Sequence, residues 1–525
     1  MRGERHILPS IPALFFVGIL AFIMFVFQEP LLNSDGDLAR HLRHGEYMLQ
    51  HHDLIRADPF SFTRAGQPFV PFEYGSQLIF ALTHRGAGLA GVTVLAALLI
   101  ATAHALLARY LLRRGVEPLL AIVVVLAAAM LGIGHWLARP HLLTLVAIPV
   151  LLELLTPLGR GRLWPFALLF VIWANVHGGF VYGLVLIGIF GVAALLEAIR
   201  TRSSSEPRTD RYQQVRFYAL AFAVSAAATL ATPLGLALPR HILSTLGETY
   251  VLNHTSEFAS PNFHLASAKL FLWVLLAALA AAIWSRRQVS ILSTLLILAG
   301  IDFALVYQRN VTLFAFTALP VLAVELDGQW RAIPLLRGLR TSFEAGSRGA
   351  STALWIILGA GAAIALAAVH GRVGGRQWIA DGFSPQRMPV HAVTAARTAG
   401  LSGHLFSDFT YGGYILYAWP EQKVFIDGGV DFYGGDLMRD YSVIRGMQTG
   451  WRELMQRWDL AVMLVRPAAP VAAELVHDGG WKYWYCDAQA VVLIRTGGPA
   501  DRARSAPGPN PRDCRPRGST EETGS

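Results

Sequence analysis

The sequence predicts an all-α polytopic membrane protein with about 11 transmembrane helices and a small C-terminal extracytoplasmic α/β domain. The composition supports this class, because 54% of the 525 residues are hydrophobic and only 15% are charged, against roughly 25% charged in an average chain. Apolar runs near the roughly 20 residues that cross a bilayer recur along most of the chain. The loops between these runs differ in charge. The net charge of +9, much of it on loop arginines, therefore indicates membrane topology rather than a nucleic-acid partner.

The apolar runs define the predicted spans. They lie at 8–28, 87–112, 118–134, 141–156, 163–176, 179–198, 215–231, 267–284, 289–306, 311–326 and 351–369. The run at 163–176 is short for a span. Arg2 and Arg5 precede the first run and no small-residue cleavage site follows it, so we expect a retained anchor rather than a signal peptide.

The distribution of arginine over alternate loops predicts the orientation. One set of loops holds Arg2, Arg5, Arg109, Arg113, Arg114, Arg160, Arg162, Arg200, Arg202, Arg208, Arg211, Arg216, Arg286, Arg287, Arg331, Arg337, Arg340 and Arg348. Beyond the long first loop, the other set holds little more than Arg139, Arg240 and Arg309. The positive-inside rule places the N-terminus in the cytoplasm, and an odd number of spans places the C-terminal domain outside. The preference for arginine over lysine is typical of a bacterium with a GC-rich genome, so we expect a multi-pass protein of the inner (plasma) membrane.

Three regions are predicted. A transmembrane domain covers 1–370 and includes a first outer loop at 29–86 and a second at 232–265. A periplasmic α/β domain covers 371–497, because strand-like runs at 424–426, 460–465 and 490–494 alternate with amphipathic stretches at 434–447 and 470–478. The remaining residues, 498–525, are rich in Pro, Gly, Ser and Arg and are expected to be disordered. Cys486 and Cys514 are the two cysteines of the chain; they lie far apart, one of them in the tail, and do not predict a disulfide framework.

The acidic pair Asp35-Gly36-Asp37 follows the first span and is the candidate catalytic site. A carboxylate this close to a bilayer is expensive unless it has a function. If Asp37 opens a helix, then Asp37, His41 and His44 share one face of it. One carboxylate could deprotonate an acceptor hydroxyl while the other holds a divalent cation, with the histidines as further ligands. The alternative is that Asp35 only caps the helix and the histidines form a solvated face.

This arrangement resembles the GT-C superfamily of integral-membrane glycosyltransferases, which use polyprenyl-phosphate-linked sugars. The acidic pair is similar to the Asp-x-Asp in the same loop of oligosaccharyltransferase catalytic subunits and to the acidic pair of protein mannosyltransferases. Asp58-Pro59-Phe60-Ser61-Phe62-Thr63 and Pro71-Phe72-Glu73-Tyr74 resemble the loop of bacterial members. The resemblance implies that an acid of this loop acts as catalytic base, with Asp35 as the first candidate and Asp37 as the second. The chain departs from the oligosaccharyltransferases because it lacks their Trp-Trp-Asp motif, which argues against protein N-glycosylation.

Substrate-binding residues are expected at the outer ends of the spans. Arg139 and His141 lie in the segment His135 to His141, and Arg309 lies between Gln308 and Asn310. A guanidinium there could bind a phosphate of the donor, or could simply reach the lipid headgroups.

Five further positions complete the candidate set. His177 follows the short fifth run beside two glycines, where a plain helix turn is equally expected. Glu73 and Glu257 are outer acids that could line a cleft or serve as interfacial caps. Asp427 and Asp431 follow a strand-like run, a usual place for ligand residues but equally for a turn.

The leading hypothesis is therefore a glycosyltransferase that moves a sugar from a polyprenyl-phosphate donor onto a glycan, lipid or protein acceptor at the outer membrane face. The residues are compatible with a divalent metal (Mg²⁺ or Mn²⁺) at Asp37, His41 and His44, but do not require one. Two alternatives stay open. One is a transporter or flippase of a lipid-linked substrate, which predicts ionisable residues in mid-span. The other is a non-catalytic membrane assembly protein whose tail domain recruits a partner.

Overall fold

The computed structural model describes residues 8–156, 161–200, 212–284, 289–336, 338 and 352–502. Its contacts divide the chain into two compact units. Unit 1 comprises Met1–Gln28, Ala90–Ile242 and Leu252–Ile379, and unit 2 comprises Glu29–Leu89, Leu243–Val251 and Ala380–Ser525. The first outer loop thus packs with the C-terminal domain, whereas we expected it within a transmembrane domain ending at 370.

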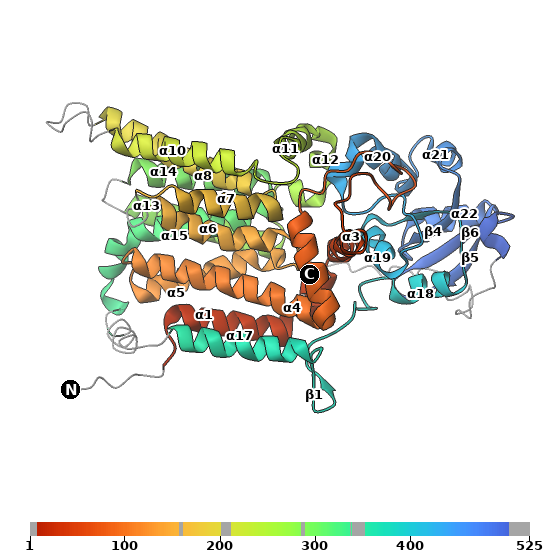
Figure 1. Cartoon of the computed structure of the whole chain (residues 1–525), viewed down its shortest axis with the longest axis horizontal. Helices are drawn as coiled ribbons and strands as arrows, with labels where there is room; N and C mark the ends of the chain where they lie inside the picture. The colour runs from red at the N-terminus through yellow and green to blue at the C-terminus, as the bar shows by residue number, and fades with distance from the viewer. Residues whose placement is uncertain are drawn as a thin grey trace. The chain divides into compact units, whose positions relative to one another are not determined.

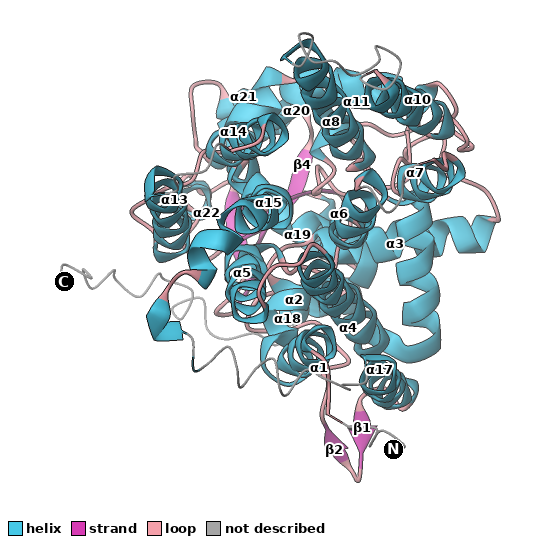
Figure 2. Cartoon of the chain, turned by 90° about the vertical axis from the view of Figure 1, so that its left-hand side faces the viewer, coloured by secondary structure: helices cyan, strands magenta, loops and turns pink. Residues whose placement is uncertain are grey.

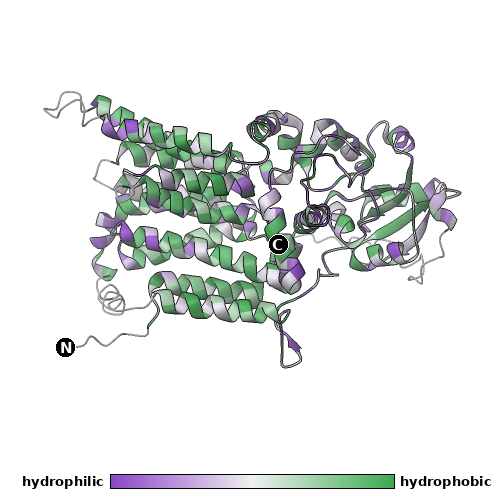
Figure 3. Cartoon of the chain, in the orientation of Figure 1, coloured by the Kyte–Doolittle hydropathy of each residue, from purple (hydrophilic) through white to green (hydrophobic). Residues whose placement is uncertain are grey.

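Apolar helices dominate unit 1, as the hydropathy colours in Figure 3 show. Five described helices are long and apolar enough to cross a membrane: Ile11–Asn33, Tyr74–Arg113, Pro118–His135, Phe180–Arg200 and Gln308–Arg331. Shorter apolar helices lie at His141–Leu155, Trp164–Val176, Ala268–Ala280, Ile291–Val306 and Thr352–Ala368. Every predicted apolar run coincides with a helix, so the all-α membrane class is confirmed, while the count of about 11 spans stays a prediction.

The helices of unit 1 pack side by side. They are α1 (Ile11–Phe22), the π-helix η1 (Ile23–Phe27), most of α4 (Tyr74–Arg113), α5 (Pro118–Gly132), α6 (His141–Leu155), α7 (Trp164–Val176), α8 (Phe180–Arg200), α10 (Gln213–Ala228), α13 (Ala266–Trp284), α14 (Ile291–Val306), α15 (Val311–Arg331) and α17 (Thr352–Ala368). Helix α15 packs against α5 and α14, α8 packs against α10, and α1 packs against α17. Figures 1 and 2 show these neighbours from two directions.

Unit 2 combines the first outer loop with the C-terminal domain. Its elements are α3 (Asp37–His51), the first turns of α4, α18 (Val390–Thr398), β3 (His404–Ser407), α19 (Phe409–Ala418), α20 (Val430–Arg445), α21 (Trp451–Arg457), β4 (Leu460–Val465), α22 (Pro470–His477), β5 (Trp481–Cys486) and β6 (Val491–Arg495). The connecting helices α2 (Gln28–Asn33), α11 (Ala237–Gly247) and α12 (Thr249–His254) lie where the chain passes between the units.

A four-stranded sheet forms the centre of unit 2, in the order β3-β4-β6-β5. Strand β4 pairs parallel with β3 and antiparallel with β6, which also pairs antiparallel with β5. Strands β4 and β6 confirm two of the predicted runs, and α20 and α22 confirm the amphipathic stretches. The run at 424–426 is not a strand of this sheet. Val424 instead makes isolated bridges to Leu405 of β3 and to Ser61 of the first outer loop.

The bridge at Val424 fixes the outer loop to the C-terminal domain. Phe62 N donates to the Val424 carbonyl at 3.1 Å, Val424 N donates to the Phe60 carbonyl at 3.1 Å, and Thr63 Oγ1 donates to the Phe425 carbonyl at 2.6 Å. Asp58 shapes the turn before these contacts, because its carboxylate accepts from the backbone nitrogens of Phe60 and Ser61. The stretch 58–63 therefore has a structural role.

Some expectations concern residues outside the described part of the chain. Among the loop arginines these are Arg2, Arg5, Arg160, Arg202, Arg208, Arg211, Arg286, Arg287, Arg337, Arg340 and Arg348. Of the predicted disordered tail, 498–502 is described and contains the short helix Pro499–Arg502, while 503–525 lies outside. Cys486 on β5 is buried and disulfide-bonded, which the sequence did not predict.

Candidate functional site

Helix α3 begins at Asp37, which meets the condition for a shared face with His41 and His44, and Gly36 occupies the capping position. Asp35 Oδ1 accepts a hydrogen bond from Asp37 N at 3.1 Å. The carboxylate therefore satisfies one of the free N–H groups of the first turn. His41 and His44 follow on the same helix and are buried rather than facing solvent.

Two glycines allow the acidic loop to sit directly on α19. A Cβ on Gly36 would collide with the carbonyl oxygen of Thr410, and one on Gly413 would collide with the carbonyl oxygen of Gly36. A third close approach occurs at Gly428, where a Cβ would collide with the carboxylate of Asp37. Glycine at these positions is what brings α3 and the segment after Phe425 together.

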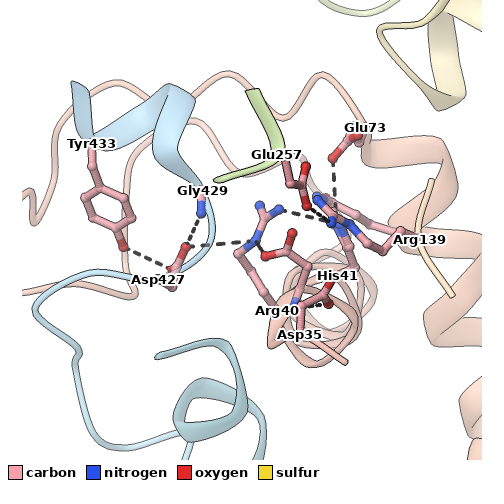
Figure 4. Close-up of polar contacts among 11 residues, drawn as sticks. Asp35, Arg40, His41, Glu73, Arg139, Glu257, Asp427, Gly429 and Tyr433 are labelled. Carbon is pink, nitrogen blue, oxygen red and sulfur yellow. Dashed lines mark hydrogen bonds and ion pairs between the residues drawn. The ribbon is translucent and has the colours of Figure 1, made fainter. Parts of the chain in front are cut away.

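Asp37, Arg40 and Asp427 form a buried group that we call the acid-rich triad. Arg40 Nε lies 3.7 Å from Asp37 Oδ1 and 3.9 Å from Asp427 Oδ1. Figure 4 shows Arg40 pointing toward Asp427, which also accepts from Gly429 N at 2.7 Å and from the Tyr433 hydroxyl at 3.0 Å. The arginine thus holds α3 against the segment 427–433.

Burial governs the protonation of this triad. Burial raises the pKa of Asp427 to about 6, although Arg40 and the hydrogen bonds from Gly429 and Tyr433 oppose this shift. Burial alone would lower the pKa of Arg40, but the charges of Asp37 and Asp427 raise it. Arg40 therefore stays charged, and the charge of Asp427 responds to mild acid.

His41 and Glu73 continue this polar chain on the other side of Arg40. His41 Nδ1 lies 3.8 Å from Glu73 Oε2 and 3.4 Å from Gln77 Nε2. Glu73 lies at the start of α4 and is buried. It is therefore an internal partner of His41 in unit 2.

His44 does not complete a metal site with Asp37 and His41. Its ring stacks on Phe60 at 4.5 Å between centroids, and neither ring nitrogen has a hydrogen-bond partner in the described structure. Burial, followed by the charge of Arg40, holds its pKa well below the usual value. Within the described residues, no group of three or more His, Cys, Asp or Glu side chains could hold a metal ion. With the Arg40 guanidinium beside Asp37, this donor set does not fit Mg²⁺ or Mn²⁺.

Asp35 differs from Asp37 in its surroundings, because it lines a cavity of about 240 Å³. The cavity lies within unit 2, between the acidic loop, the segment 386–388 and the end of β4. Apart from Met388, the side chains that line it are polar or charged. A second cavity, lined by Arg40, His44, Asp427 and Tyr433 among others, measures only about 10 Å³, room for about one water. Asp35 is therefore the loop acid that a polar substrate can reach.

Arg139, Glu257 and Arg309 form a second charged group, in unit 1, that we call the arginine-rich triad. Arg139 Nη1 lies 2.6 Å from Glu257 Oε1, and Arg309 Nη1 lies 3.5 Å from Glu257 Oε2. Figure 4 shows the pairing of Arg139 with Glu257. Burial alone would raise the pKa of Glu257, but Arg139 and Arg309 lower it to about 2. Three residues far apart in the sequence thus come together as an ionised group.

The two outer histidines of unit 1 take part in local hydrogen bonds. His141 Nε2 donates to the His135 carbonyl at 2.8 Å. His177 ends α7, and its Nδ1 accepts from Gly179 N at 2.9 Å and lies 2.8 Å from Thr144 Oγ1. These contacts agree with the helix-turn interpretation of the segment, and a substrate role for His141 or His177 stays a prediction.

The fold is similar to that of solved membrane glycosyltransferases. The oligosaccharyltransferase of Archaeoglobus fulgidus aligns with a TM-score of 0.53 at 12% identity, over 87% of this chain and 69% of that chain. The same values hold for the structure of that enzyme, AglB, in complex with an inhibitory peptide and a dolichol-phosphate. ArnT from Cupriavidus metallidurans bound to undecaprenyl phosphate aligns with a TM-score of 0.45 at 11% identity, over 91% of this chain and 97% of that chain.

The chain thus shares the fold of a solved membrane oligosaccharyltransferase, in agreement with the resemblance stated from the acidic loop. No protein-family model and no protein of curated function matches the sequence. At 12% identity the likeness to the oligosaccharyltransferase establishes the fold, whereas the chemistry depends on the residues of the site.

Several members of the site were not predicted as such. Arg40 stands one helical turn after Asp37, a spacing that brings side chains together on a helix and could have signalled the pair. Asp427 was considered because it follows a strand-like run. Arg387 and Arg466, which line the cavity with Asp35, lie in no motif. Only the folded chain brings them to it.

Proposed function

We propose that this chain is a membrane glycosyltransferase that moves a sugar from a polyprenyl-phosphate donor onto an acceptor hydroxyl at the extracytoplasmic face of the inner membrane. Asp35 is the general base. The observation that carries this assignment is that Asp35 lines an open polar cavity, whereas Asp37 is buried beside Arg40. The fold shared with a known oligosaccharyltransferase supports the reaction class.

The proposed reaction is a displacement at the anomeric carbon of the donor sugar. The acceptor oxygen forms a bond to that carbon while its hydrogen passes to the carboxylate of Asp35. The bond between the anomeric carbon and the phosphate oxygen breaks, and the polyprenyl phosphate leaves with the electron pair. A positioned carboxylate of this kind typically contributes about 10²–10⁴-fold to the rate.

The arginine-rich triad supports a role in binding the donor. Arg139 and Arg309 are cations at the ends of apolar helices, and together with Glu257 they carry one net positive charge. A guanidinium matches the geometry of a phosphate and stabilises the charge that builds up on a leaving phosphate. The dolichol-phosphate seen with the archaeal enzyme is a ligand of the same chemistry.

The disulfide at Cys486 supports the extracytoplasmic placement of unit 2. Disulfides persist in the periplasm and outside the cell but are rare in the cytoplasm. Cys486 lies on β5, in the same unit as Asp35. The placement agrees with the charge distribution of the loops.

The substitution Asp35→Asn tests the proposal. It keeps the size of the side chain and one hydrogen-bond acceptor for Asp37 N but removes the base. We expect cells that carry it to show the envelope glycan profile of a deletion strain, measured by mass spectrometry, with protein levels unchanged. Asp436→Asn is the matched control, because Asp436 is an exposed acid of the same unit. It should leave the profile as in the parent.

A parental glycan profile in the Asp35→Asn strain would refute the base role and favour a non-catalytic assembly protein. A profile unchanged even by deletion of the gene would refute glycosyl transfer to the envelope altogether.

For the donor site, Arg139→Gln and Arg309→Gln should raise the KM for the polyprenyl-phosphate sugar in membranes more than they lower kcat.

A further inference from the structure

The cavity beside Asp35 contains two arginines as well as the acid. Arg387 and Arg466 line it together with Asp35, and most of the other lining groups are neutral and polar, such as Asn33, Thr410 and Gln489. Its volume of about 240 Å³ far exceeds the roughly 10–15 Å³ that a single water needs. The cavity therefore has room for a small polar group, and an apolar isoprenoid chain would find no apolar wall in it.

The positive charge of Arg466 is only partly balanced. Its nearest carboxylate, Asp408, is buried, and Asp408 Oδ1 accepts from Arg445 Nε at 3.1 Å. Asp408 Oδ2 accepts from the backbone nitrogen of Arg466 at 2.8 Å, and Arg466 Nε lies 3.9 Å from the same oxygen. Two guanidinium groups thus face one carboxylate, and that of Arg466 is too far from it for a hydrogen bond.

The Arg466 guanidinium is nevertheless held near the cavity. Its Cζ lies 5.7 Å from the ring centroid of Tyr411, whose hydroxyl donates to the Gln489 carbonyl at 2.7 Å. Arg387, the second arginine of the cavity, pairs with Glu29 at 3.3 Å through Nε. A guanidinium beside a ring and with free N–H donors is suited to a planar or tetrahedral oxyanion.

We infer that this cavity binds an oxyanion, a phosphate or a carboxylate, that belongs to the acceptor, with Arg466 as its main contact and Arg387 as a second. The inference rests on the proposed function, because Asp35 can deprotonate an acceptor hydroxyl only if the acceptor enters this cavity. The hydroxyl then lies at Asp35 and the anion at Arg466. The acceptor is accordingly an acidic glycan or a phosphate-bearing molecule rather than a neutral sugar.

Binding of simple anions to the purified full-length protein tests this assignment without any transfer reaction. The probes are inorganic phosphate and glucuronate, with glucose as the neutral comparison, and the protein is held in nanodiscs of a neutral phospholipid. Phosphorus and saturation-transfer NMR report the affinities. We expect both anions to bind and Arg466→Gln to weaken them by about tenfold or more, with a several-fold loss for Arg387→Gln. Asp35→Asn should strengthen anion binding, because it removes a like charge from the same cavity.

The control variant is Arg439→Gln. Arg439 and Arg466 have equally exposed side chains, both at 58%, but Arg439 pairs with exposed Asp436 on α20 and does not line the cavity. It should bind both anions as the parent does. Arg466→Lys, which keeps the charge, should retain part of the affinity, and equal thermal unfolding of the variants separates a binding loss from a folding defect. Parental affinity in Arg466→Gln, no anion binding in the parent, or equal binding of glucose would each overturn the inference.

A final arm separates the acceptor from the donor phosphate. Undecaprenyl phosphate in the nanodisc should leave the Arg466-dependent affinity for inorganic phosphate unchanged if the cavity belongs to the acceptor. If undecaprenyl phosphate instead competes with inorganic phosphate, and this competition disappears in Arg466→Gln, the cavity belongs to the donor and the inference is overturned. The proposed function fails separately, through a parental glycan profile in the Asp35→Asn strain, and that result would leave the binding data as they are.

Discussion

The two charged triads of this protein have opposite compositions. In unit 2 one guanidinium, Arg40, lies between two carboxylates, while in unit 1 one carboxylate, Glu257, pairs with two guanidiniums. Their surroundings differ as well. Arg40 and Asp427 are buried, but the side chains of Arg309 and Glu257 are 31% and 32% exposed.

This difference separates a structural role from a binding role. Taking several charges out of water is expensive, and a buried ion group can contribute by fixing one arrangement of the chain. The acid-rich triad does so by joining α3 to the segment 427–433, which places the loop of Asp35. The more exposed arginine-rich triad can exchange solvent for a ligand at lower cost, and its excess charge suits a phosphate.

The largest effect should come from removing the cation of the acid-rich triad. Arg40→Met leaves Asp37 and Asp427 buried without the guanidinium between them, and we expect a loss of about 3–5 kcal/mol in the free energy of unfolding. Denaturant unfolding of the purified protein measures it. The triple variant Arg40→Met, Asp37→Asn, Asp427→Asn should recover much of the loss. A loss below about 1 kcal/mol for Arg40→Met would show that the triad does not hold the loop.

The two triads should also differ in how pH changes their contribution to stability. The pKa of Asp427 is raised to about 6 in the folded protein, whereas it is about 4 in the unfolded chain. The folded state therefore binds a proton more tightly, and this stabilises the fold at pH values below 4. The stabilisation is lost as the pH rises through 6. The loss amounts to roughly 2–3 kcal/mol. Asp427→Asn should remove it, whereas Asp436→Asn should not, as judged by melting temperatures between pH 4 and 7.

Glu257 should show the reverse dependence. Its folded pKa is lowered to about 2, so the stabilisation is present above the unfolded pKa and is lost as the pH falls through 2. The difference in melting temperature between the parent and Glu257→Gln should therefore shrink on acidification below pH 4.5 or so. A constant difference across that range would mean that the pairing with Arg139 and Arg309 contributes little.

The sequence predicted the helices of unit 1 well, because a span must bury every backbone polar group within itself and so leaves a local apolar pattern. It also indicated the helix that starts at Asp37. It did not predict that the first outer loop joins the C-terminal sheet, since the bridge from Ser61 to Val424 links residues far apart in sequence. Strands β3 and β5 were missed for a related reason. They are the two edge strands of the sheet, and their pattern alone does not distinguish them from loop.

The candidate site likewise combines residues that a local pattern predicts with residues that only the folded chain brings together. Asp35 and Asp37 stand out because charged residues next to a span are rare, and the spacing of Asp37 and Arg40 on one helix is a local signal of their pairing. Nothing local predicts that Asp427 lies on the other side of Arg40. The approach of Asp427 depends on Gly428, which lets the chain after Phe425 come close to the Asp37 carboxylate. Arg466 reaches the cavity of Asp35 through the parallel pairing of β3 with β4, a non-local contact that no motif encodes.

The smallest expected effect is that of replacing His44, which lies beside Arg40. This substitution tests whether the acid-rich triad includes a further charge or a bound metal ion. Its ring stacks on Phe60, lies 5.5 Å from Phe69 between centroids, and has two buried nitrogens with no hydrogen-bond partner in the described structure. His44→Phe replaces these nitrogens with apolar atoms of similar shape, so we expect a change in unfolding free energy of less than about 1 kcal/mol, on the stabilising side. A metal ligand would behave differently, because its loss would abolish any stabilisation by added Mn²⁺. Thermal unfolding of the parent and of His44→Phe, each with Mn²⁺ and with a chelator, distinguishes the two. Stabilisation by Mn²⁺ in the parent alone would restore His44 to the metal-binding role that its position after Asp37 first suggested.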